Sequence, residues 1–466
     1  MSRAVKFNLE ATFSYLEQFS MVQNGIIESK IPTLDGLEVE FKKQSRGFEF
    51  ETGPIKNSGF HPIVYQDSYY GLTKPFNIHW KGNVLKVENG AGVGKIHPGK
   101  GFSTSGLLYD LQMDFQQSKN YLRAILPLTQ TMHRPVKYMK GEPFVVGGSY
   151  RACGLIKLTL NGLSFRFFDF NWGEQHCLFI DSGTEVTLSE FMIGMDGLLA
   201  VYAFISGAYV RDERWMVTSD SPSFDHIKEF KFDRLADSVD AQDELLNPFL
   251  HLDYNKLSER LWLKEEVFNN LVQMSLDDRR ILRAVKLIAE GRGVPVELGV
   301  STYCVALETV KSIVLEKNEA ALGPIQDKEI EESIKQALKG VIGKWPPDER
   351  LDKERLLRKI DDINKISNNE GFLKAFEVLG ISLTDEDKKF IRRRNRFLHG
   401  EIPFKGEDPG DPHQFELKKV SLHLLMLTAS LVLKMAGYEG PVLNFWKLWE
   451  IYRGENKEPV QLFRDI

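Results

Sequence analysis

The sequence predicts an α+β protein: a β-rich, sandwich-like N-terminal domain with a few helices, followed by an all-α C-terminal helical bundle. Residues 37–219 contain short runs rich in aromatic and β-branched residues, several of which alternate apolar with polar positions. From about Asn255 onward, apolar residues recur with a period near 3.6, which is typical of helices. We therefore expect a β-rich domain over 1–235, a linker over 236–254 and a helical domain over 255–466.

Strand signals dominate the N-terminal half. The runs LEVEF, FEFET, FNIHW, NVLKVEN, GLIKLTLNGLSFRFFDF and RWMVTS each read as one strand or more. The pair Asn161-Gly162 lies between two such runs and predicts a tight hairpin turn. Apolar residues at helical spacing predict two amphipathic helices that pack on the strands, over Leu9–Met21 and Leu107–Ile125.

Helical periodicity and Gly or Pro stop signals divide the C-terminal half. The expected helices are Asn255–Met274, Asp277–Glu290, Gly299–Leu315, Asp327–Leu338, Glu349–Ile363, Phe372–Leu379, Asp385–His399, His413–Ala436 and Val442–Tyr452. The segment His423–Ala436 is apolar on nearly all sides, which indicates a central bundle helix or a dimer seam. Trp446 and Trp449 form an aromatic stripe, for which packing is a better explanation than base stacking.

Composition excludes several classes of protein. In 466 residues, 60 basic side chains against 65 acidic ones give a formal charge of -5, so no whole-protein positive field attracts nucleic acid. The cysteines (Cys153, Cys177 and Cys304) form neither a disulfide framework nor a paired zinc motif, which favours a reducing cytoplasm. The longest apolar stretch, Gly197–Val210, is shorter than the ~18 residues that a membrane span needs. We expect a cytoplasmic protein without a membrane segment.

One local exception to this charge balance is the segment Lys388–Arg396, where six of nine residues are cationic and none is acidic. Read as a helix, it starts at Thr384 as N-cap, with acidic residues in the first turn and Gly400 after its end. The basic residues would then complement the negative end of the helix dipole, which is the plain surface-helix interpretation. If the segment binds RNA, the residues expected to contact it are Lys388, Lys389, Arg392, Arg393 and Arg396.

The same helix contains Arg394, Asn395 and His399, three residue types used in phosphodiester cleavage. Asn395 and His399 are four apart and share a helical face, and Arg394 lies at its edge. An arginine fork suits phosphate oxygens, and a histidine near a helix C-terminus favours its cationic form. One helix cannot surround a phosphate, so two copies related by a two-fold axis are the natural geometry. The Arg and His spacing alone is a weak signal.

The run RNRFLHG resembles the signature of HEPN-domain ribonucleases, which are small helical bundles. The overall layout is also similar to ApeA-type bacterial anti-phage, or abortive-infection, proteins. This resemblance implies metal-independent RNA cleavage by a homodimer or higher oligomer, with 2',3'-cyclic phosphate products and no cofactor. His399 would act as acid or base, Arg394 would stabilise charge and Asn395 would be its polar neighbour. The N-terminal domain would then restrain the nuclease until a trigger, such as a phage product, binds.

Other functions remain open at this stage. The helical bundle could instead be a non-catalytic scaffold whose β-rich domain recognises a partner. The Gly-rich stretch Asn89–Gly101 fails the phosphate-loop pattern in spacing and at Ile96, so a mobile loop between strands is the better interpretation, and nucleotide binding there has little support. Glu174, His176, Cys177 and Asp181 lack the spacing of a metal site, and Cys304 reads as a buried thiol. No metal is expected.

Overall fold

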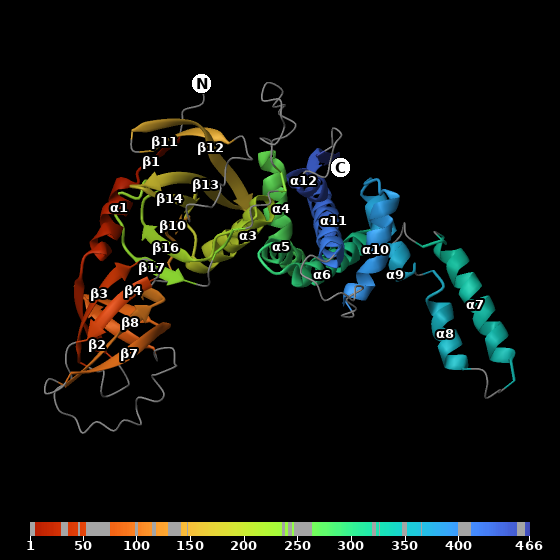
Figure 1. Cartoon of the computed structure of the whole chain (residues 1–466), viewed down its shortest axis with the longest axis horizontal. Helices are drawn as coiled ribbons and strands as arrows, with labels where there is room; N and C mark the ends of the chain where they lie inside the picture. Colours follow the sequence, from red (N-terminus) through yellow and green to blue (C-terminus); the bar gives the residue numbers. More distant parts are fainter. Residues whose placement is uncertain are drawn as a thin grey trace. The chain divides into compact units, whose positions relative to one another are not determined.

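A computed structural model gives the positions of residues 5–28, 36–44, 47–52, 75–97, 101–113, 118–128, 141–146, 148–234, 238–240, 245–246, 263–318, 323–325, 327–346, 352–364, 366–398, 412–453 and 462–466 (Figure 1). The chain divides into two compact units, residues 1–276 and 277–466. The first is rich in strands and the second in helices, which confirms the expected mixture of α and β structure.

The N-terminal unit is built on one long sheet with the strand order β1-β11-β12-β13-β14-β10-β16-β17-β9-β6-β5-β2-β3-β4-β8-β7. Its strands are β1 (Val5–Phe7), β2 (Gln23–Glu28), β3 (Glu38–Gln44), β4 (Gly47–Thr52), β5 (Phe76–Trp80), β6 (Asn83–Val87), β7 (Gly90–His97), β8 (Gly101–Leu108), β9 (Asp110–Met113), β10 (Tyr121–Pro127), β11 (Glu142–Val146), β12 (Ser149–Leu160), β13 (Leu163–Trp172), β14 (Gln175–Ser182), β16 (Glu213–Ser219) and β17 (Phe230–Arg234). A separate pair joins β15 (Ala208–Tyr209) to β18 (Val239–Asp240).

Local sequence explains the hairpins. Asn161 and Gly162 both have positive φ, at 50° and 78°, so β12 turns into β13 with Leu160 paired to Leu163, as predicted. The Gly-rich stretch forms the antiparallel pair β7 and β8, with residues 98–100 between them outside the described range. Strands therefore occupy most of the segment that was expected to be a loop.

The predicted helix over Leu107–Ile125 is wrong. This segment supplies β9 and β10, and β10 lies between β14 and β16 near the middle of the sheet. Leu122, Ala124, Ile125 and Leu126 are all buried, so side chains on both faces of the strand are apolar. A central strand loses its alternation for this reason, and its apolar run resembles a helical pattern.

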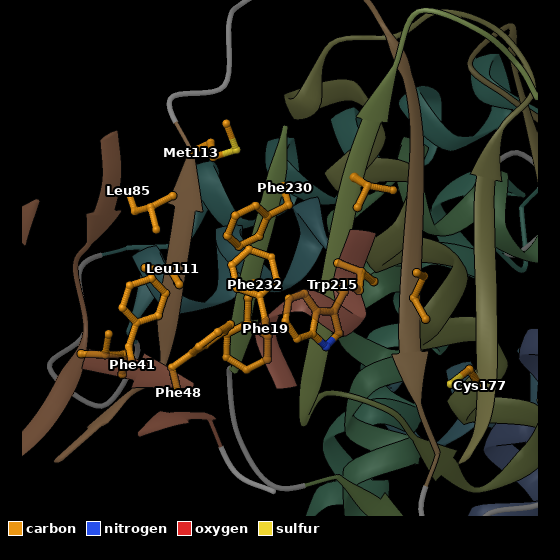
Figure 2. Close-up of a cluster of buried hydrophobic side chains, with 14 of the residues drawn as sticks. Phe19, Phe41, Phe48, Leu85, Leu111, Met113, Cys177, Trp215, Phe230 and Phe232 are labelled. Atoms are coloured by element: carbon orange, nitrogen blue, oxygen red, sulfur yellow. The ribbon is translucent and has the colours of Figure 1, made fainter. Parts of the chain in front are cut away.

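An aromatic core fills the curved sheet of this unit. The predicted N-terminal helix is confirmed as α1 (Glu10–Glu17) followed by the 3-10 turn η1 (Gln18–Ser20). Figure 2 shows Phe19 of this turn among Phe48, Trp215 and Phe230, with ring centroids 5.7, 6.1 and 4.5 Å away. Burial of several aromatic rings is the main stabilising contribution here.

Helix α3 (Leu188–Ser206) packs between the sheet and α4 (Glu265–Asp277). A Cβ on Gly194 would meet the Phe165 ring at 2.4 Å, and one on Gly197 would meet Leu276 at 2.7 Å, so both glycines allow close packing. Two helices, α3 and α6 (Val296–Lys317), have the length and apolar composition of membrane spans, but 67% and 50% of their apolar windows are buried. A core helix passes the same test, and the stretch expected to be too short for a span lies largely in α3.

The boundary between the units lies later than the expected linker. Three side chains of α4 accept hydrogen bonds from backbone N–H groups of β12 and of the turn after it: Glu265 from Lys157, Asn269 from Thr159 and Gln273 from Asn161. The helix thereby covers an edge of the sheet that would otherwise expose unpaired donors. As a result α4, expected in the helical domain, belongs to the N-terminal unit, and β18 lies inside the expected linker.

The C-terminal unit is a helical bundle closed by a small β-pair. Its elements are α5 (Arg279–Gly291), α6 (Val296–Lys317), α7 (Lys328–Lys344), α8 (Lys353–Asp361), α9 (Asn368–Val378), α10 (Asp385–Leu398), α11 (Pro412–Met435), β19 (Pro441–Leu443), α12 (Phe445–Tyr452) and β20 (Phe463–Asp465). Helix α11 is buried along nearly its whole length from Leu417, which confirms the predicted central helix. It packs on α5, α6, α10 and α12, and α9 and α10 cover α6.

Candidate active site

The helix that carries the predicted motif, α10, begins as the sequence predicts. Thr384 accepts a hydrogen bond from the backbone N–H of Asp387 at 3.2 Å. The Asp387 carboxylate in turn accepts from the backbone N–H of Thr384 at 2.8 Å, so the two residues form a reciprocal cap. Arg464 from β20 donates to the same carboxylate at 2.8 Å. The start of α10 is therefore fixed by its own cap and by a residue of the C-terminal strand β20.

Burial divides the basic segment between two faces of α10. Asp387, Phe390, Ile391 and Arg394 are buried, with the three- and four-residue spacing of one helical face. Of the cations predicted to bind RNA, Lys389 and Arg392 are exposed, whereas Lys388 and Arg393 are half-buried. Lys388 also pairs with Asp385 at 3.2 Å. Arg394 thus lies on the face opposite Lys389 and Arg392.

Part of the predicted site lies outside the described side chains. The backbone of α10 extends to Leu398, but the side chains of Asn395 and Arg396 lie outside the description. His399 lies outside the described residues altogether. The predicted sharing of a face by Asn395 and His399 therefore stays a prediction.

Arg394 has 0% of its surface exposed and is one of the largest fully buried side chains. Its Nη1 donates to the backbone carbonyl of Ile391 at 2.6 Å and to the Asn369 Oδ1 on α9 at 3.2 Å. Its Nε and Nη2 have no hydrogen-bond partner among the residues that the structure describes. The nearest carboxylate oxygen, on Glu308 of α6, lies 3.8 Å from Nη2, which is too far for a hydrogen bond.

A second cation lies beside Arg394, on α6. The Arg394 guanidinium carbon lies 3.4 Å from the ring centroid of Phe372, and the Lys311 Nζ lies 4.5 Å from the same centroid. Lys311 also donates to Asn368 at 2.7 Å. The site therefore combines two cations and one carboxylate around a single aromatic ring, which leaves an excess of positive charge.

The pKa values of these groups shift in the direction that burial dictates. Burial lowers the pKa of Arg394, and Glu308 opposes the shift. Burial likewise lowers the pKa of Lys311, an effect that Arg394 strengthens and Glu308 opposes. Both shifts report an environment in which positive charge is incompletely compensated, and a bound anion would compensate it.

Cys304, on the same face of α6, is a buried thiol, as predicted. Burial raises its pKa to about 12, so it is protonated at neutral pH and a poor nucleophile. Its Sγ lies 3.8 Å from the backbone carbonyl oxygen of Arg394. Cys304 therefore lies beside Arg394 but does not act as a nucleophile.

Sequence reasoning missed Glu308, Lys311 and Phe372. The two charged residues are three apart in α6, and each resembles an ordinary polar position of an amphipathic helix. Phe372 lies on a third helix and resembles a core residue. Their relation to Arg394 depends on the packing of α6, α9 and α10, and no local pattern reports it.

The other cluster considered as metal ligands is dispersed along β14. Cys177 is buried, whereas His176 binds Asn171 through Nδ1 at 2.6 Å and lies 2.8 Å from an oxygen of Asp169. Asp181 instead pairs with the buried Arg123. Across the described part of the chain, no three His, Cys, Asp or Glu side chains converge on a point that could hold a metal ion.

Comparison of the chain with protein-family models, with curated proteins and with solved structures finds no match in any of the three. The function therefore has to be argued from the site itself.

Proposed function

We propose that the C-terminal unit is a HEPN-type ribonuclease that cleaves RNA without a metal ion, at a site completed by a second copy of the chain. The observation that carries this proposal is the buried guanidinium of Arg394, with two N–H bearing atoms left unpartnered among the described residues. A buried donor without an acceptor costs about 1–3 kcal/mol, and such a cost is commonly retained at functional sites. A phosphate oxygen would satisfy both donors at once.

The site chemistry fits transfer at a phosphodiester. In the proposed reaction the ribose 2'-oxygen attacks the adjacent phosphorus and loses its proton to a base, and the bond to the 5'-oxygen breaks as that oxygen gains a proton. Arg394 and Lys311 would hold the negative charge that develops on the phosphoryl oxygens. The motif resemblance assigns the proton transfers to His399. Exposed Lys389 and Arg392 lie on the opposite face of α10, so they would contact RNA at phosphates remote from the cleaved one.

The buried guanidinium of Arg394 lies close to the protein surface, within reach of a phosphate. Its partner Asn369 is exposed, and 38% of the Glu308 side chain is exposed to solvent. The guanidinium lies 3.2 Å from the Asn369 Oδ1 and 3.8 Å from a Glu308 carboxylate oxygen, so a small movement of these two side chains would admit a phosphate. A nuclease that is restrained before its trigger binds would also keep Arg394 covered in this way.

The test is cleavage of total RNA in EDTA by the purified full-length protein and by residues 277–466 alone, which lack the restraining unit, with end-group analysis of the fragments. We expect 2',3'-cyclic phosphate ends from wild type and loss of cleavage in Arg394→Ala and His399→Ala. Arg392→Ala is the matched control, because it removes an exposed arginine of the same helix. It should weaken RNA binding modestly, with a smaller salt dependence, and leave the end groups unchanged.

The biological role that we propose is cytoplasmic defence against phage, with the N-terminal unit restraining the nuclease until a phage product binds. Growth of cells that express the full chain should be normal without phage and should stop on infection. Arg394→Ala should abolish this arrest. Equal arrest with Arg394→Ala, in cells with equal protein levels, would argue against a nuclease role.

A non-catalytic scaffold is the second candidate, and the complete burial of Arg394 favours it. In that role the guanidinium would serve only to join α6, α9 and α10. In that case neither wild type nor Arg394→Met would cleave RNA, and the variant would lose stability, whereas a nuclease would cleave as wild type and lose cleavage in a variant that still folds. Measuring cleavage and folding of this one variant separates the two candidates.

A further inference from the structure

Helix α7 has an apolar face that is largely exposed in the described part of the chain. Its Asp327 N-cap accepts hydrogen bonds from the N–H groups of Glu329 and Ile330, and the helix continues through Gly340 and Gly343, although Gly340 was expected to end it. None of its residues is buried. Five large apolar side chains are 36–60% exposed: Ile330, Ile334, Leu338, Val341 and Trp345. We call these five residues the α7 stripe.

The neighbouring helix α8 leaves the stripe open. The two helices lie side by side in Figure 1, and α8 contacts the flank of α7 through the pair Lys339–Asp361 at 2.5 Å. Asn364, just after α8, donates to Glu331 at 2.8 Å. Both contacts involve polar residues beside the stripe. A single soluble helix rarely exposes five large apolar residues in one row, and such a row usually marks an interaction surface.

The charge of α7 is reversed between its two halves. Residues 327–334 contain four acidic residues and one lysine, a net charge of -3, and residues 335–345 contain three lysines and no acidic residue, a net charge of +3. The helix is therefore electrostatically complementary to an antiparallel copy of itself. A partner with one sign of charge along its length would meet repulsion at one end.

The spacing of the stripe supports the same pairing. If α7 meets its two-fold copy with residues 337 and 338 at the centre, Ile334 lies opposite Val341 and Ile330 lies opposite Trp345. The small residues Ser333, Ala337 and Gly340 run beside the stripe and allow the two backbones to approach closely. A Cβ on Gly340 would meet no atom within 4 Å, so space exists on this side.

We propose that α7 is a self-association helix that pairs antiparallel, through the α7 stripe, with α7 of a second copy of this chain. The pairing is isologous and closes into a dimer. This inference goes beyond the proposed nuclease, whose composite site requires a second copy but does not require contact at α7.

Single cysteines in the full-length protein test both the contact and its direction. Ala337→Cys lies at the centre of the pairing and should form a disulfide-linked dimer on mild oxidation. Glu329→Cys is the matched control, because an antiparallel pair places the two copies of position 329 ~25 Å apart at 1.5 Å per residue. Wild type sets the background from the native cysteines, of which Cys177 and Cys304 are buried.

Adding Ile334→Glu and Val341→Glu to Ala337→Cys should abolish the cross-link and shift the mass measured by light scattering towards the monomer. Both positions are exposed, so circular dichroism should be unchanged. Cross-linking at 337 no greater than wild type would overturn the proposal, and equal cross-linking at 329 would overturn the antiparallel direction. Neither readout depends on RNA, so the nuclease proposal stands or falls separately on the cleavage assay.

Discussion

The two units each bury an arginine, and they satisfy it differently. Arg123 in β10 is 0% exposed and binds Asp181 through two hydrogen bonds, of 2.8 and 2.7 Å. Its Nη1 donates to the Asn8 carbonyl and the Thr12 hydroxyl, and the guanidinium lies 4.0 Å from the Phe224 ring centroid. Arg394 is equally buried but has hydrogen-bond partners on Nη1 alone among the described residues.

If the proposed function holds, this difference separates a structural arginine from a binding one. Arg123 holds the N-terminal helix to the centre of the sheet, and its charge is neutralised by a paired carboxylate. Arg394 keeps two donors and a net positive charge near an exposed rim, which is costly unless an anion binds. Replacing Arg123 should therefore destabilise its unit strongly, and added anions should leave that unit unchanged. Replacing Arg394 should destabilise its unit far less, and added anions should stabilise the wild-type unit.

The largest expected effect is on stability, in Arg123→Ala. Removing one partner of a buried pair leaves Asp181 charged and uncompensated, and this should lower the free energy of unfolding of the N-terminal unit by about 3–5 kcal/mol. Hydrogen exchange of the β10 and β14 amides measures the loss in that unit alone. Arg394→Met is the matched control, expected to change the unfolding free energy of its own unit far less. A similar loss in both variants would remove the distinction between the two arginines.

The next effect is on catalysis, in Arg394→Ala. Loss of a preorganised donor to the developing charge should reduce the cleavage rate by about 100- to 1,000-fold. Lys311→Gln should reduce it less, because Lys311 is the second cation of the site. Single-turnover rates at saturating RNA measure both. Unchanged rates in Arg394→Ala protein that remains folded would contradict a catalytic arginine.

A smaller effect is anion binding by the resting protein. Inorganic phosphate at ten times its Kd would stabilise the C-terminal unit by about 1.4 kcal/mol. Differential scanning calorimetry should show a rise in Tm for the C-terminal unit of wild type and none for Arg394→Met. The N-terminal unit serves as the internal control, since each side-chain nitrogen of Arg123 already has a hydrogen-bond partner. A rise in both proteins would place the anion elsewhere.

The smallest effect concerns pH and the buried His423 in α11. Its Nδ1 lies 3.0 Å from the Lys419 carbonyl oxygen, and its ring lies 4.5 Å from that of Phe390. Burial lowers the pKa of His423 below its ordinary value, although Glu386 and Asp387 oppose the shift. The unfolded state therefore binds this proton first, so the stability of the C-terminal unit should fall as the pH drops below about 6.5.

His423→Gln should remove that part of the pH dependence, as measured by denaturant unfolding between pH 5 and pH 8. The N-terminal unit should not change its response between the two proteins. An identical slope in wild type and variant would show that other groups set the acid sensitivity of the C-terminal unit.

The success of the sequence predictions depended on whether a feature is local. The Asn161-Gly162 turn, the Thr384 cap, the N-terminal helix and the central helix α11 are each encoded within a few turns of chain, and the structure confirms them. The segment 107–125 was misassigned because burial on both faces of β10 removed its alternation. The place of α4 was also missed, since its hydrogen bonds to β12 join residues far apart in the sequence.

The sequence by itself determined the α+β composition, most helices of the C-terminal unit and the position of Arg394 within a basic helix. Only the tertiary structure decided that Arg394 points into the unit, that Glu308, Lys311 and Phe372 lie around it, and that Arg123 is paired with Asp181. The physical reason is that periodicity encodes which face of a helix is apolar, whereas the packing of separate elements sets which polar groups meet in the interior.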